Sequence, residues 1–213
     1  MRVLMKRLKD VISGPVFKLV GYRPQQVTLA AWDREYRDGS WTYLEGIGSL
    51  AGLVSILGYC QFLAPATILD VGCGAGALAR KLKVLPYKSY LGIDISAEAI
   101  AQAGALGDER TAFAAADAGA FHTDRSFDAI VFNQCLNYLP DPAATMAQYK
   151  RFLSPAGCII VSLCETARNR ALWPLVTRGM IVEDAMSYEQ AEGRGTTKVL
   201  RPAMAYSTPG GTT

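Results

Sequence analysis

The sequence predicts one α/β domain, doubly wound around a mostly parallel β-sheet, with a helical cap before the sheet and an antiparallel hairpin at its end. Three observations lead to this prediction. Between about residues 66 and 163, short β-rich runs alternate with helical stretches, as in parallel βαβ units. A glycine-rich loop follows the first of these runs and precedes a helix. Two later strand-like runs, within 180–201, are joined by a short segment with two glycines, which predicts the hairpin.

The composition agrees with a single globular domain. The chain has 213 residues, of which 50% are hydrophobic and 19% charged, so it can bury a substantial core but has no room for a second full domain. No apolar run reaches the roughly 18 residues of a transmembrane helix, so such a helix is not expected. Five cysteines without a C-x-x-C pair favour neither a disulfide framework nor a zinc site, so we expect no metal and a reducing, cytoplasmic location. A net charge of +3 is too small to indicate a nucleic-acid-binding protein.

Positive charge is concentrated at the N-terminus. Residues 1–31 carry six basic side chains and a single acid, so the rest of the chain is slightly acidic. Within residues 1–20, apolar and basic side chains fall on opposite faces of a predicted helix. Such a helix can lie on an anionic membrane surface, which would make the protein peripheral to the inner face of the membrane. The alternative, which we favour, is packing on the domain or on a partner subunit. A signal peptide is disfavoured because a glycine, a proline and a lysine interrupt the apolar stretch.

The elements follow in order along the chain. Residues 1–64 form the basic arm and helical cap, residues 65–202 form the core, and residues 203–213 form a tail that we expect to be disordered. In the cap, a turn at Asp38-Gly39 interrupts a polar-aromatic segment. The strands expected in the core are 67–71, 89–93, 111–115, 127–132, 158–162, 180–188 and 196–201. The expected helices are 47–63, 76–83, 97–106, 143–153 and 166–177.

The glycine loop lies in the run ILDVGCGAG, residues 68–76. Gly72, Gly74 and Ala77 satisfy the pattern G-x-G-x-x-G/A of dinucleotide sites, which alone does not discriminate between cofactors. Asp70 is more informative, because a carboxylate beside a pyrophosphate would repel it. We expect Asp70 to end the strand and face the loop, where it can attract a cation or an ammonium group. The loop therefore favours a positively charged ligand without phosphate.

Polar residues also follow the next strands. Asp94 comes 24 residues after Asp70, at the end of the second strand, where a carboxylate can accept hydrogen bonds from ribose hydroxyls. Ile95 beside it could cover an adenine face. Asp117 follows the third strand and can accept from an exocyclic amine, and Asn133 follows the fourth. Each acid alone is most often a solvated turn or cap residue, but their succession at consecutive strand ends makes coincidence improbable.

With these motifs in order, residues 66–163 resemble a class I S-adenosylmethionine-dependent methyltransferase of the small bacterial type. The resemblance rests on ILDVGCGAG, LGIDIS, AADAGAF, FDAIVFNQCLNYL and RFLSPAGCIIVS. It implies S-adenosylmethionine as cofactor and a seven-stranded Rossmann-like sheet with a reversed terminal hairpin. The segment 32–44 is similar to the N-terminal cap of such enzymes, where aromatic side chains close over the cofactor.

The resemblance also implies individual contacts with the cofactor. By resemblance, the methionine moiety would be lined by Asp70, Gly72, Gly74 and Gly76. Asp94 would hold the ribose hydroxyls, Ile95 would pack on the adenine, and Asp117 and Ala118 would recognise the adenine edge. The backbone of Asn133 would hold the amino-acid end.

Catalytic residues are harder to predict. Methyl transfer from a sulfonium is an in-line displacement, so positioning can supply much of the catalysis, and a general base helps only some acceptors. Cys73 and Cys135 have no recognisable base partner and are interpreted as packing residues. The candidates for catalysis are Gln134, Tyr138 and His122, although His122 follows the adenine-binding stretch, outside the usual acceptor side of the fold. The candidates for acceptor binding are Tyr36, Trp41, Tyr43 and Asn137.

The acceptor is narrowed only by exclusion. No Asn-Pro-Pro-Tyr-type run follows the fourth strand, which disfavours an exocyclic-amine nucleobase methyltransferase, and the acidic body disfavours a large nucleic-acid footprint. We therefore expect a small-molecule acceptor, with a saccharide or a lipid-linked intermediate as the leading hypothesis, since the basic arm could bring the enzyme to a membrane. Two alternatives stay open at this point: an NAD(P)-dependent oxidoreductase, and a non-catalytic cofactor-binding or interaction protein. The oligomeric state does not follow from the sequence.

Overall fold

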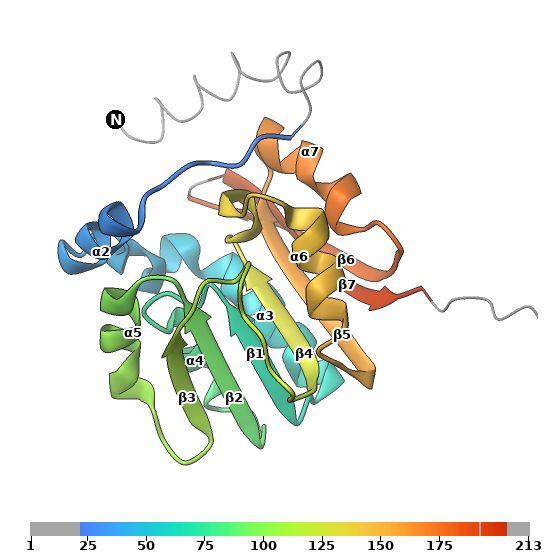
Figure 1. Ribbon diagram of the computed structural model, residues 1–213, viewed down its shortest axis with the longest axis horizontal. Helices are drawn as coiled ribbons and strands as arrows, with labels where there is room; N and C mark the ends of the chain where they lie inside the picture. The colour runs from blue at the N-terminus through green and yellow to red at the C-terminus, as the bar shows by residue number, and fades with distance from the viewer. Residues whose placement is uncertain (1–21, 192, 204–213) are drawn as a thin grey trace, which may run out of the picture.

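A mixed β-sheet forms the centre of the molecule (Figure 1). The computed structural model describes residues 22–191 and 193–203, and within them the sheet has seven strands in the order β3-β2-β1-β4-β5-β7-β6. The first five strands along the chain are parallel, whereas β7 is antiparallel to both β5 and β6. The strands are β1 Thr67–Val71, β2 Ser89–Asp94, β3 Thr111–Ala115, β4 Phe127–Asn133, β5 Leu153–Cys164, β6 Met180–Gln190 and β7 Gly193–Pro202. The expected Rossmann-like sheet with a reversed hairpin is confirmed.

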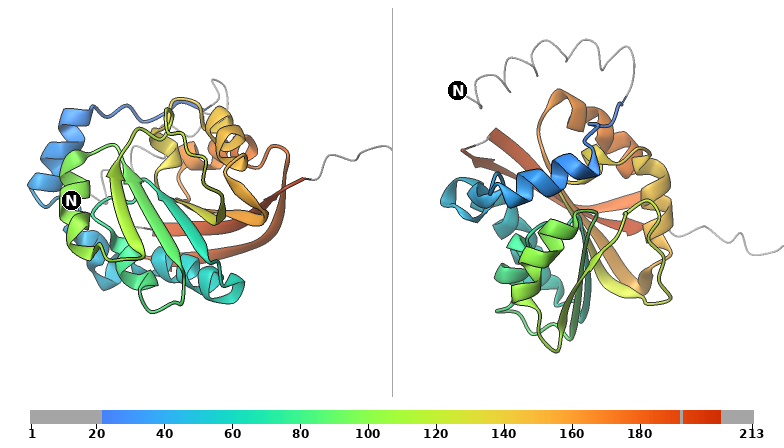
Figure 2. Two further views of the ribbon diagram at one scale, coloured as in Figure 1. Left: turned by 60° about the horizontal axis from the view of Figure 1, so that its bottom comes forward. Right: turned by 60° about the vertical axis from the view of Figure 1, so that its left-hand side comes forward.

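Helices cover both faces of the sheet (Figures 1 and 2). On one face lie α3 (Leu50–Leu63), α4 (Ala77–Leu82) and α5 (Ala97–Ala103), and on the other lie α6 (Pro142–Lys150) and α7 (Ala167–Val176). Successive strand residues alternate between two apolar cores: Ile68 packs with α3 and α4, whereas Leu69 packs with α6 and α7. Burial on both faces explains why these strands read as continuous apolar runs.

Several helices and strands begin or end at residues other than those expected from the sequence, because 3₁₀ turns and an irregular strand pairing occur at their ends. The helix expected at 143–153 ends at Lys150, and β5 begins at Leu153 rather than at residue 158. Leu153 pairs with Phe127 of β4 across an irregular stretch, which extends the strand toward its N-terminus. The helix expected at 47–63 becomes an α-helix only at Leu50, after two short 3₁₀ helices, η1 (Thr42–Glu45) and η2 (Ile47–Ser49). Likewise α5 ends at Ala103 and continues as the 3₁₀ turn η3 (Gly104–Leu106).

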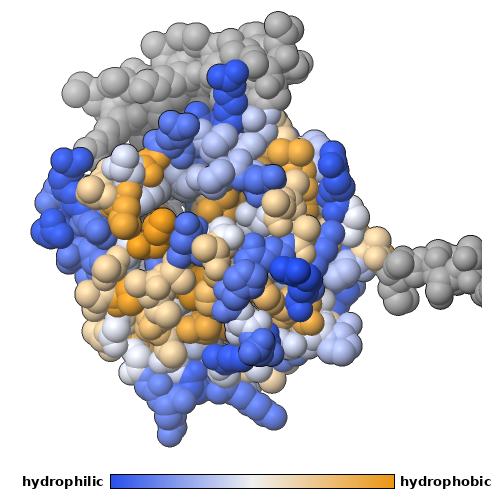
Figure 3. All heavy atoms as spheres, viewed as in Figure 1, coloured by the Kyte–Doolittle hydropathy of each residue, from blue (hydrophilic) through white to orange (hydrophobic). Residues whose placement is uncertain are grey.

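The connection from β3 to β4 is unlike the others. Residues 116–126 contain no helix, so this crossover is a loop. In the view of Figure 1 no helix lies in front of β2 and β3, and apolar side chains appear there between charged ones (Figure 3). Ala112 and Ala114 of β3 are exposed accordingly.

The N-terminal part of the described chain crosses the carboxyl edge of the sheet, from α7 toward α5 (Figure 2). Gln25 N–H donates to the Asn137 carbonyl at 2.8 Å, and the Tyr22 hydroxyl donates to the Leu136 carbonyl at 3.3 Å, both in the 3₁₀ helix η4 (Leu136–Tyr138). Helix α2 (Leu29–Arg37) follows, with Thr28 as its N-cap, and supplies the expected helical cap. The basic helix expected within 1–20 and the tail from 204 lie outside the described residues. Among the residues that are described, no helix is both long and apolar enough to cross a membrane.

Candidate cofactor and acceptor site

The glycine loop between β1 and α4 has a conformation that side chains would obstruct. Gly72, Gly74 and Gly76 have φ angles of +70°, +55° and +82°, the left-handed region that glycine adopts without strain. A Cβ on Gly72 would lie 2.6 Å from the Cβ of Cys135, in the loop after β4. The loop is also tied to β2, because the N–H groups of Gly72 and Cys73 both donate to the Ile93 carbonyl. These bonds hold a backbone cradle without side chains at its three glycines, against which Cys135, Tyr36 and Leu106 pack.

Asp70 does not face this loop as an accessible charge, contrary to the expectation. It is the fourth residue of β1, and its side chain is 1% exposed, on the sheet face that also carries Tyr90 of β2. The Tyr90 hydroxyl donates to Asp70 Oδ2 at 2.6 Å, while Asp70 Oδ1 has no hydrogen-bond partner within the described chain. Burial raises the pKa of Asp70 to about 7, although the bond from Tyr90 opposes that rise. Burial therefore favours the protonated form of this carboxyl more than water does, and Oδ1 is left for a further partner.

Asp94 ends β2 beside the glycine loop, as expected. Its Oδ2 accepts from Gly74 N–H and its Oδ1 from Ser96 N–H, both at 2.9 Å. Burial raises its pKa, and these backbone N–H groups oppose the rise. Ile95 is 41% exposed next to it, an apolar side chain available for contact with a ligand.

Asp117 and Ala118 lie in the turn after β3, on the same edge of the sheet. Asp117 is exposed and its Oδ1 accepts from Gly119 N–H at 2.8 Å, so it closes a turn of its own backbone. The Ala118 carbonyl accepts from the Tyr149 hydroxyl of α6 at 3.0 Å. Asn133 is the last residue of β4, which is the neighbour of β1 in the sheet. The topology thus places the predicted cofactor residues on four adjacent strands, β3, β2, β1 and β4.

The other candidates are distributed differently. His122 is exposed in the β3–β4 loop, next to Phe121, which packs against Phe152 just before β5 begins. It therefore lies toward the amino edge of β5, away from the glycine loop. Gln134 follows β4, but both polar atoms of its amide are used within the protein, because Oε1 accepts from Cys164 N–H at 2.8 Å and Nε2 donates to the Tyr188 hydroxyl at 3.1 Å. These contacts leave no polar atom of the amide unpaired and do not favour a direct role for Gln134 in catalysis. Asn137 is buried in η4.

An aromatic cluster from the cap covers the loop, and it includes Trp32, the first residue of the segment expected to form the cap. The centroids of Trp32 and Tyr138 are 4.8 Å apart, and Trp41 lies 5.6 Å from Trp32 and 6.0 Å from Tyr43. Tyr36 stacks on Trp41, and its hydroxyl lies only 2.6 Å from the position of a Cβ on Gly74. Burial and the nearby Asp94 raise the pKa of Tyr36, so the hydroxyl stays neutral. Buried Trp41 Nε1 has no hydrogen-bond partner in the described part of the chain.

Helix α2 is attached to α5, next to Asp94. The Ser96 hydroxyl, which caps α5, donates to Asp33 at 2.6 Å, and Gln102 Nε2 donates to the Tyr36 carbonyl at 3.0 Å. An ion pair of 3.3 Å between Arg37 and Glu98 joins the same two helices at the surface. Asp33 and Ser96 were missed because nothing in the local sequence shows that α2 would pack on α5.

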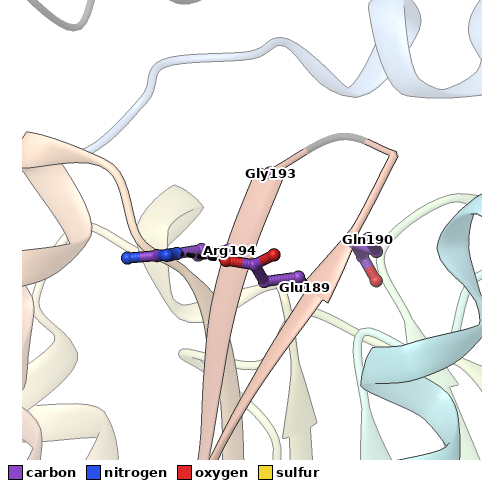
Figure 4. A pocket seen from close by; sticks show the side chains of 4 residues that line it. All are labelled: Glu189, Gln190, Gly193 and Arg194. Carbon is purple, nitrogen blue, oxygen red and sulfur yellow. Dashed lines mark hydrogen bonds and ion pairs between the residues drawn. The ribbon is translucent and has the colours of Figure 1, made fainter.

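Two shallow pockets, of about 360 and 320 Å³, lie at the tip of the β6–β7 hairpin rather than at the glycine loop. In Figure 4, Glu189 and Arg194 extend to one side of the hairpin and Gln190 to the other, toward α3. Glu189 and Arg194 form an ion pair of 2.6 Å that is mostly exposed, with 71% and 72% of the two side chains accessible. A solvated pair of this kind adds little binding energy. No group of three or more potential metal ligands occurs in residues 22–191 or 193–203.

This fold and edge geometry define a class I, Rossmann-like methyltransferase domain. A family model described as a methyltransferase domain matches residues 64–202, and the chain belongs to that family. The methyl donor of this class is S-adenosylmethionine, and the match decides against an NAD(P)-dependent oxidoreductase.

Relatives in sequence and a solved structure of similar fold are also methyltransferases. A trans-aconitate 2-methyltransferase of Methylobacterium nodulans is 30% identical over 109 residues, 51% of this chain and 42% of the relative. An uncharacterized methyltransferase of Mycobacterium bovis is 29% identical over 125 residues, 54% of this chain and 59% of the relative. The N-methyltransferase NodS from Bradyrhizobium japonicum, in complex with S-adenosyl-L-homocysteine, has the same fold at 20% identity and a TM-score of 0.72, with 83% of this chain and 98% of that chain covered. The chain thus matches about half of the length of these two curated relatives.

The residues present fit this cofactor. The cradle leaves its backbone bare of side chains at Gly72, Gly74 and Gly76, and the buried Asp70 Oδ1 is an acceptor that has no hydrogen-bond partner within the described residues. Asp94 adds a second carboxylate at the adjacent strand end, and its charge is among the causes that raise the pKa of Asp70, a combination that favours a positively charged ligand.

Proposed function

We propose that the protein transfers a methyl group from S-adenosylmethionine to a small-molecule acceptor at the carboxyl edge of the sheet. The observation that carries this proposal is the glycine cradle, with Asp94 bound to Gly74 N–H and Asp70 buried beneath. When bound, the cofactor supplies an electrophilic methyl group on a positively charged sulfur. Everything else in the proposal is assigned to side chains and backbone groups of this chain.

The proposed contacts with the cofactor follow the order of the strand ends. Asp94 accepts hydrogen bonds from the ribose hydroxyls, and Ile95 packs on the adenine. Asp117 and Ala118 recognise the adenine edge. The glycine loop, with Asp70 below it, lines the methionine moiety, and the backbone of Asn133 holds the amino-acid end. In support, these residues come from four adjacent strands.

The proposed role of the aromatic cluster is to exclude water and to orient the acceptor. Tyr36 and Trp41 lie over the loop, and Trp41 Nε1 offers a buried donor to an acceptor oxygen. Burial raises the pKa of Tyr138, so its hydroxyl stays protonated and cannot accept a proton from the acceptor. Holding nucleophile and methyl carbon in line can account for up to about 7–11 kcal/mol of barrier reduction in the best models. We therefore assign catalysis mainly to positioning, without a general base from this chain.

The proposal is tested with a methyl-donor turnover assay. The protein is incubated with S-adenosylmethionine labelled in its methyl group and with pooled metabolite, sugar-nucleotide and lipid extracts, and labelled products are identified by mass. Parallel titrations with S-adenosylhomocysteine and NAD check the cofactor class. A protein that binds S-adenosylhomocysteine but labels no pool would be assigned to non-catalytic binding instead. Tight NAD binding without S-adenosylhomocysteine binding would reject the proposal.

The finer proposal is a saccharide or lipid-linked acceptor, reached from a membrane surface. It is supported by the amphipathic sequence of residues 1–20, in which five basic side chains accompany a single acidic one. The full-length protein is expected to sediment with anionic vesicles at low salt, whereas a chain starting near Gln26 stays in the supernatant. Equal sedimentation of the two would show that residues 1–20 do not bring the protein to a membrane. The proposal of methyl transfer would not be affected.

A further inference from the structure

Gln134 has a strained backbone at the point where β4 reaches the proposed methyl-transfer site. Its φ angle is +56°, a left-handed conformation that side chains other than glycine rarely adopt. Such strain persists only where the surroundings impose it, and it is concentrated at functional sites. The contacts that impose it here come from β5 and β6.

The amide of Gln134 is held by three groups from these strands. The Gln134 Oε1 accepts from Cys164 N–H at 2.8 Å, and its Nε2 lies 3.1 Å from the Tyr188 hydroxyl and 3.4 Å from Ser162 Oγ. The Tyr188 and Ser162 hydroxyls are also hydrogen-bonded to each other at 3.0 Å. The Gln134 N–H donates to the Ser162 carbonyl at 2.9 Å. The side chain and backbone of Gln134 are thus both fixed from the hairpin side of the sheet.

Tyr188 reaches this position only because two glycines leave room for it. It lies on the edge strand β6, opposite Gly195 of β7, and a Cβ on Gly195 would be 2.3 Å from the tyrosine Cζ. On the other side, a Cβ on Gly52 of α3 would be 2.9 Å from the Tyr188 oxygen. The ring therefore crosses β7 and brings a hydroxyl from the edge of the sheet to β5 and to the loop after β4.

That loop rests directly on the glycine cradle. Cys135, the next residue, donates from Sγ to the Val71 carbonyl at 3.0 Å, and its Cβ occupies the space where a side chain on Gly72 would be. A shift of Gln134 would move Cys135, and with it the wall of the cradle beside Asn133. This wall is where the proposed function places the amino-acid end of the cofactor.

We propose that Tyr188 is a positioning residue for methyl transfer, which acts through Gln134 to set the loop that holds the amino-acid end of the cofactor. The inference rests on the proposed function. It predicts that the Tyr188 hydroxyl contributes to binding of the amino-acid portion of the cofactor and not to binding of its nucleoside.

The test compares two ligands and two tyrosines. S-adenosylhomocysteine carries the amino-acid portion, and methylthioadenosine has the same nucleoside and thioether without it. Tyr188→Phe is expected to weaken S-adenosylhomocysteine binding about three- to ten-fold, the effect of one hydrogen bond, with methylthioadenosine binding unchanged. Tyr59→Phe is the matched control, because the Tyr59 hydroxyl also makes a long-range hydrogen bond that involves β6, from α3 to Asp184 at 3.0 Å, and this bond does not involve the loop after β4. It is expected to leave both affinities unchanged.

A double-mutant cycle adds the step through Gln134. In the Gln134→Ala background, Tyr188→Phe is expected to change S-adenosylhomocysteine affinity by less than about 1.5-fold, since its partner is gone. A Tyr188→Phe variant that weakens both ligands equally, or neither, overturns the proposal, as does full additivity with Gln134→Ala. If the wild-type protein binds neither ligand, the proposed function fails before the role of Tyr188 is reached, so the two failures are distinguishable.

Discussion

The two halves of the carboxyl edge are built in different ways. In the half formed by β1 and β2, called here the glycine half, the contacts join residues that are near one another in sequence: Gly74 N–H donates to Asp94, and the Tyr90 hydroxyl donates to Asp70, each across 20 residues. In the half formed by β4, β5, β7 and β6, called here the hairpin half, side chains from distant segments converge, and Gln134 meets Tyr188 across 54 residues. The glycine half is thus a local motif that the sequence displays, and the hairpin half exists only in the folded chain.

The largest effect is expected from an added side chain in the glycine half. Gly72→Ala places a Cβ 2.6 Å from Cys135 Cβ at a φ angle of +70°, so backbone must shift. We expect S-adenosylhomocysteine binding to weaken by more than about 100-fold and the free energy of unfolding to fall by about 1–3 kcal/mol. Calorimetric titration and denaturant unfolding measure the two. Gly58→Ala, in α3 where nothing lies within 4 Å, is the control and should be neutral or stabilising. If Gly72→Ala binds S-adenosylhomocysteine as tightly as the wild type, the glycine half does not depend on a backbone free of side chains, and this prediction is wrong.

The next effect concerns the carboxylate of the same half. Asp94→Ala should weaken S-adenosylhomocysteine binding by about 1.5–3 kcal/mol, because charged hydrogen bonds are lost. Isothermal titration gives this value directly, with Glu109→Ala, an exposed acid of the α5–β3 turn, as the control. An unchanged affinity would show that the ribose lies elsewhere.

A third prediction uses the proton on Asp70. The pKa of Asp70 in the folded protein, about 7, lies above the 3.8 that is usual for an aspartic acid side chain, so between these pH values the folded protein binds more protons than the unfolded chain. This group therefore stabilises the folded state less as pH rises from about 4 to 7, and its contribution levels off above that range. Asp70→Asn cannot titrate, so the difference in Tm between variant and wild type should shift in favour of the variant across the same range. A difference that does not vary with pH would contradict the burial of this charge.

The smallest effect is expected where the cap joins the glycine half. Asp33→Ala removes the acceptor of the Ser96 hydroxyl and should lower the free energy of unfolding by about 1 kcal/mol. Arg37→Ala breaks only an exposed ion pair with Glu98 and should cost about 0–1 kcal/mol. Thermal unfolding measures the loss of stability in both variants, and limited proteolysis within residues 22–46 measures how firmly the cap is attached in each. A larger loss for Arg37→Ala than for Asp33→Ala would reverse the assignment of the attachment.

The sequence was sufficient for the sheet, because the central strands β1, β4 and β5 are mostly buried on both faces and each parallel strand is followed by a loop or helix signal. It was also sufficient to find Gly72, Gly74 and Asp94 as neighbours, since the strand ends are adjacent by topology. It was not sufficient for Asp70, whose burial depends on the register that places Tyr90 of β2 beside it. Gln134 was found as a residue of interest, but its partner Tyr188 could not be, because no periodicity relates β4 to β6. The segment that begins at Trp32 was expected to form the cap, but the contacts of Trp32 with Tyr138 and of Asp33 with Ser96 could not be predicted for the same reason, since they join segments far apart in the chain.

The position of β7 between β5 and β6 has a consequence for synthesis of the chain. Strand β6 emerges from the ribosome before β7, but its partner in the sheet is β7, so it has no neighbour to pair with until the last strand has been made. Until then β5 also presents an open edge, which can pair with another chain. The tyrosine carried by β6 can be fixed in place only when β7 inserts, so the hairpin half of the edge is completed last, after the glycine half has every strand that it needs.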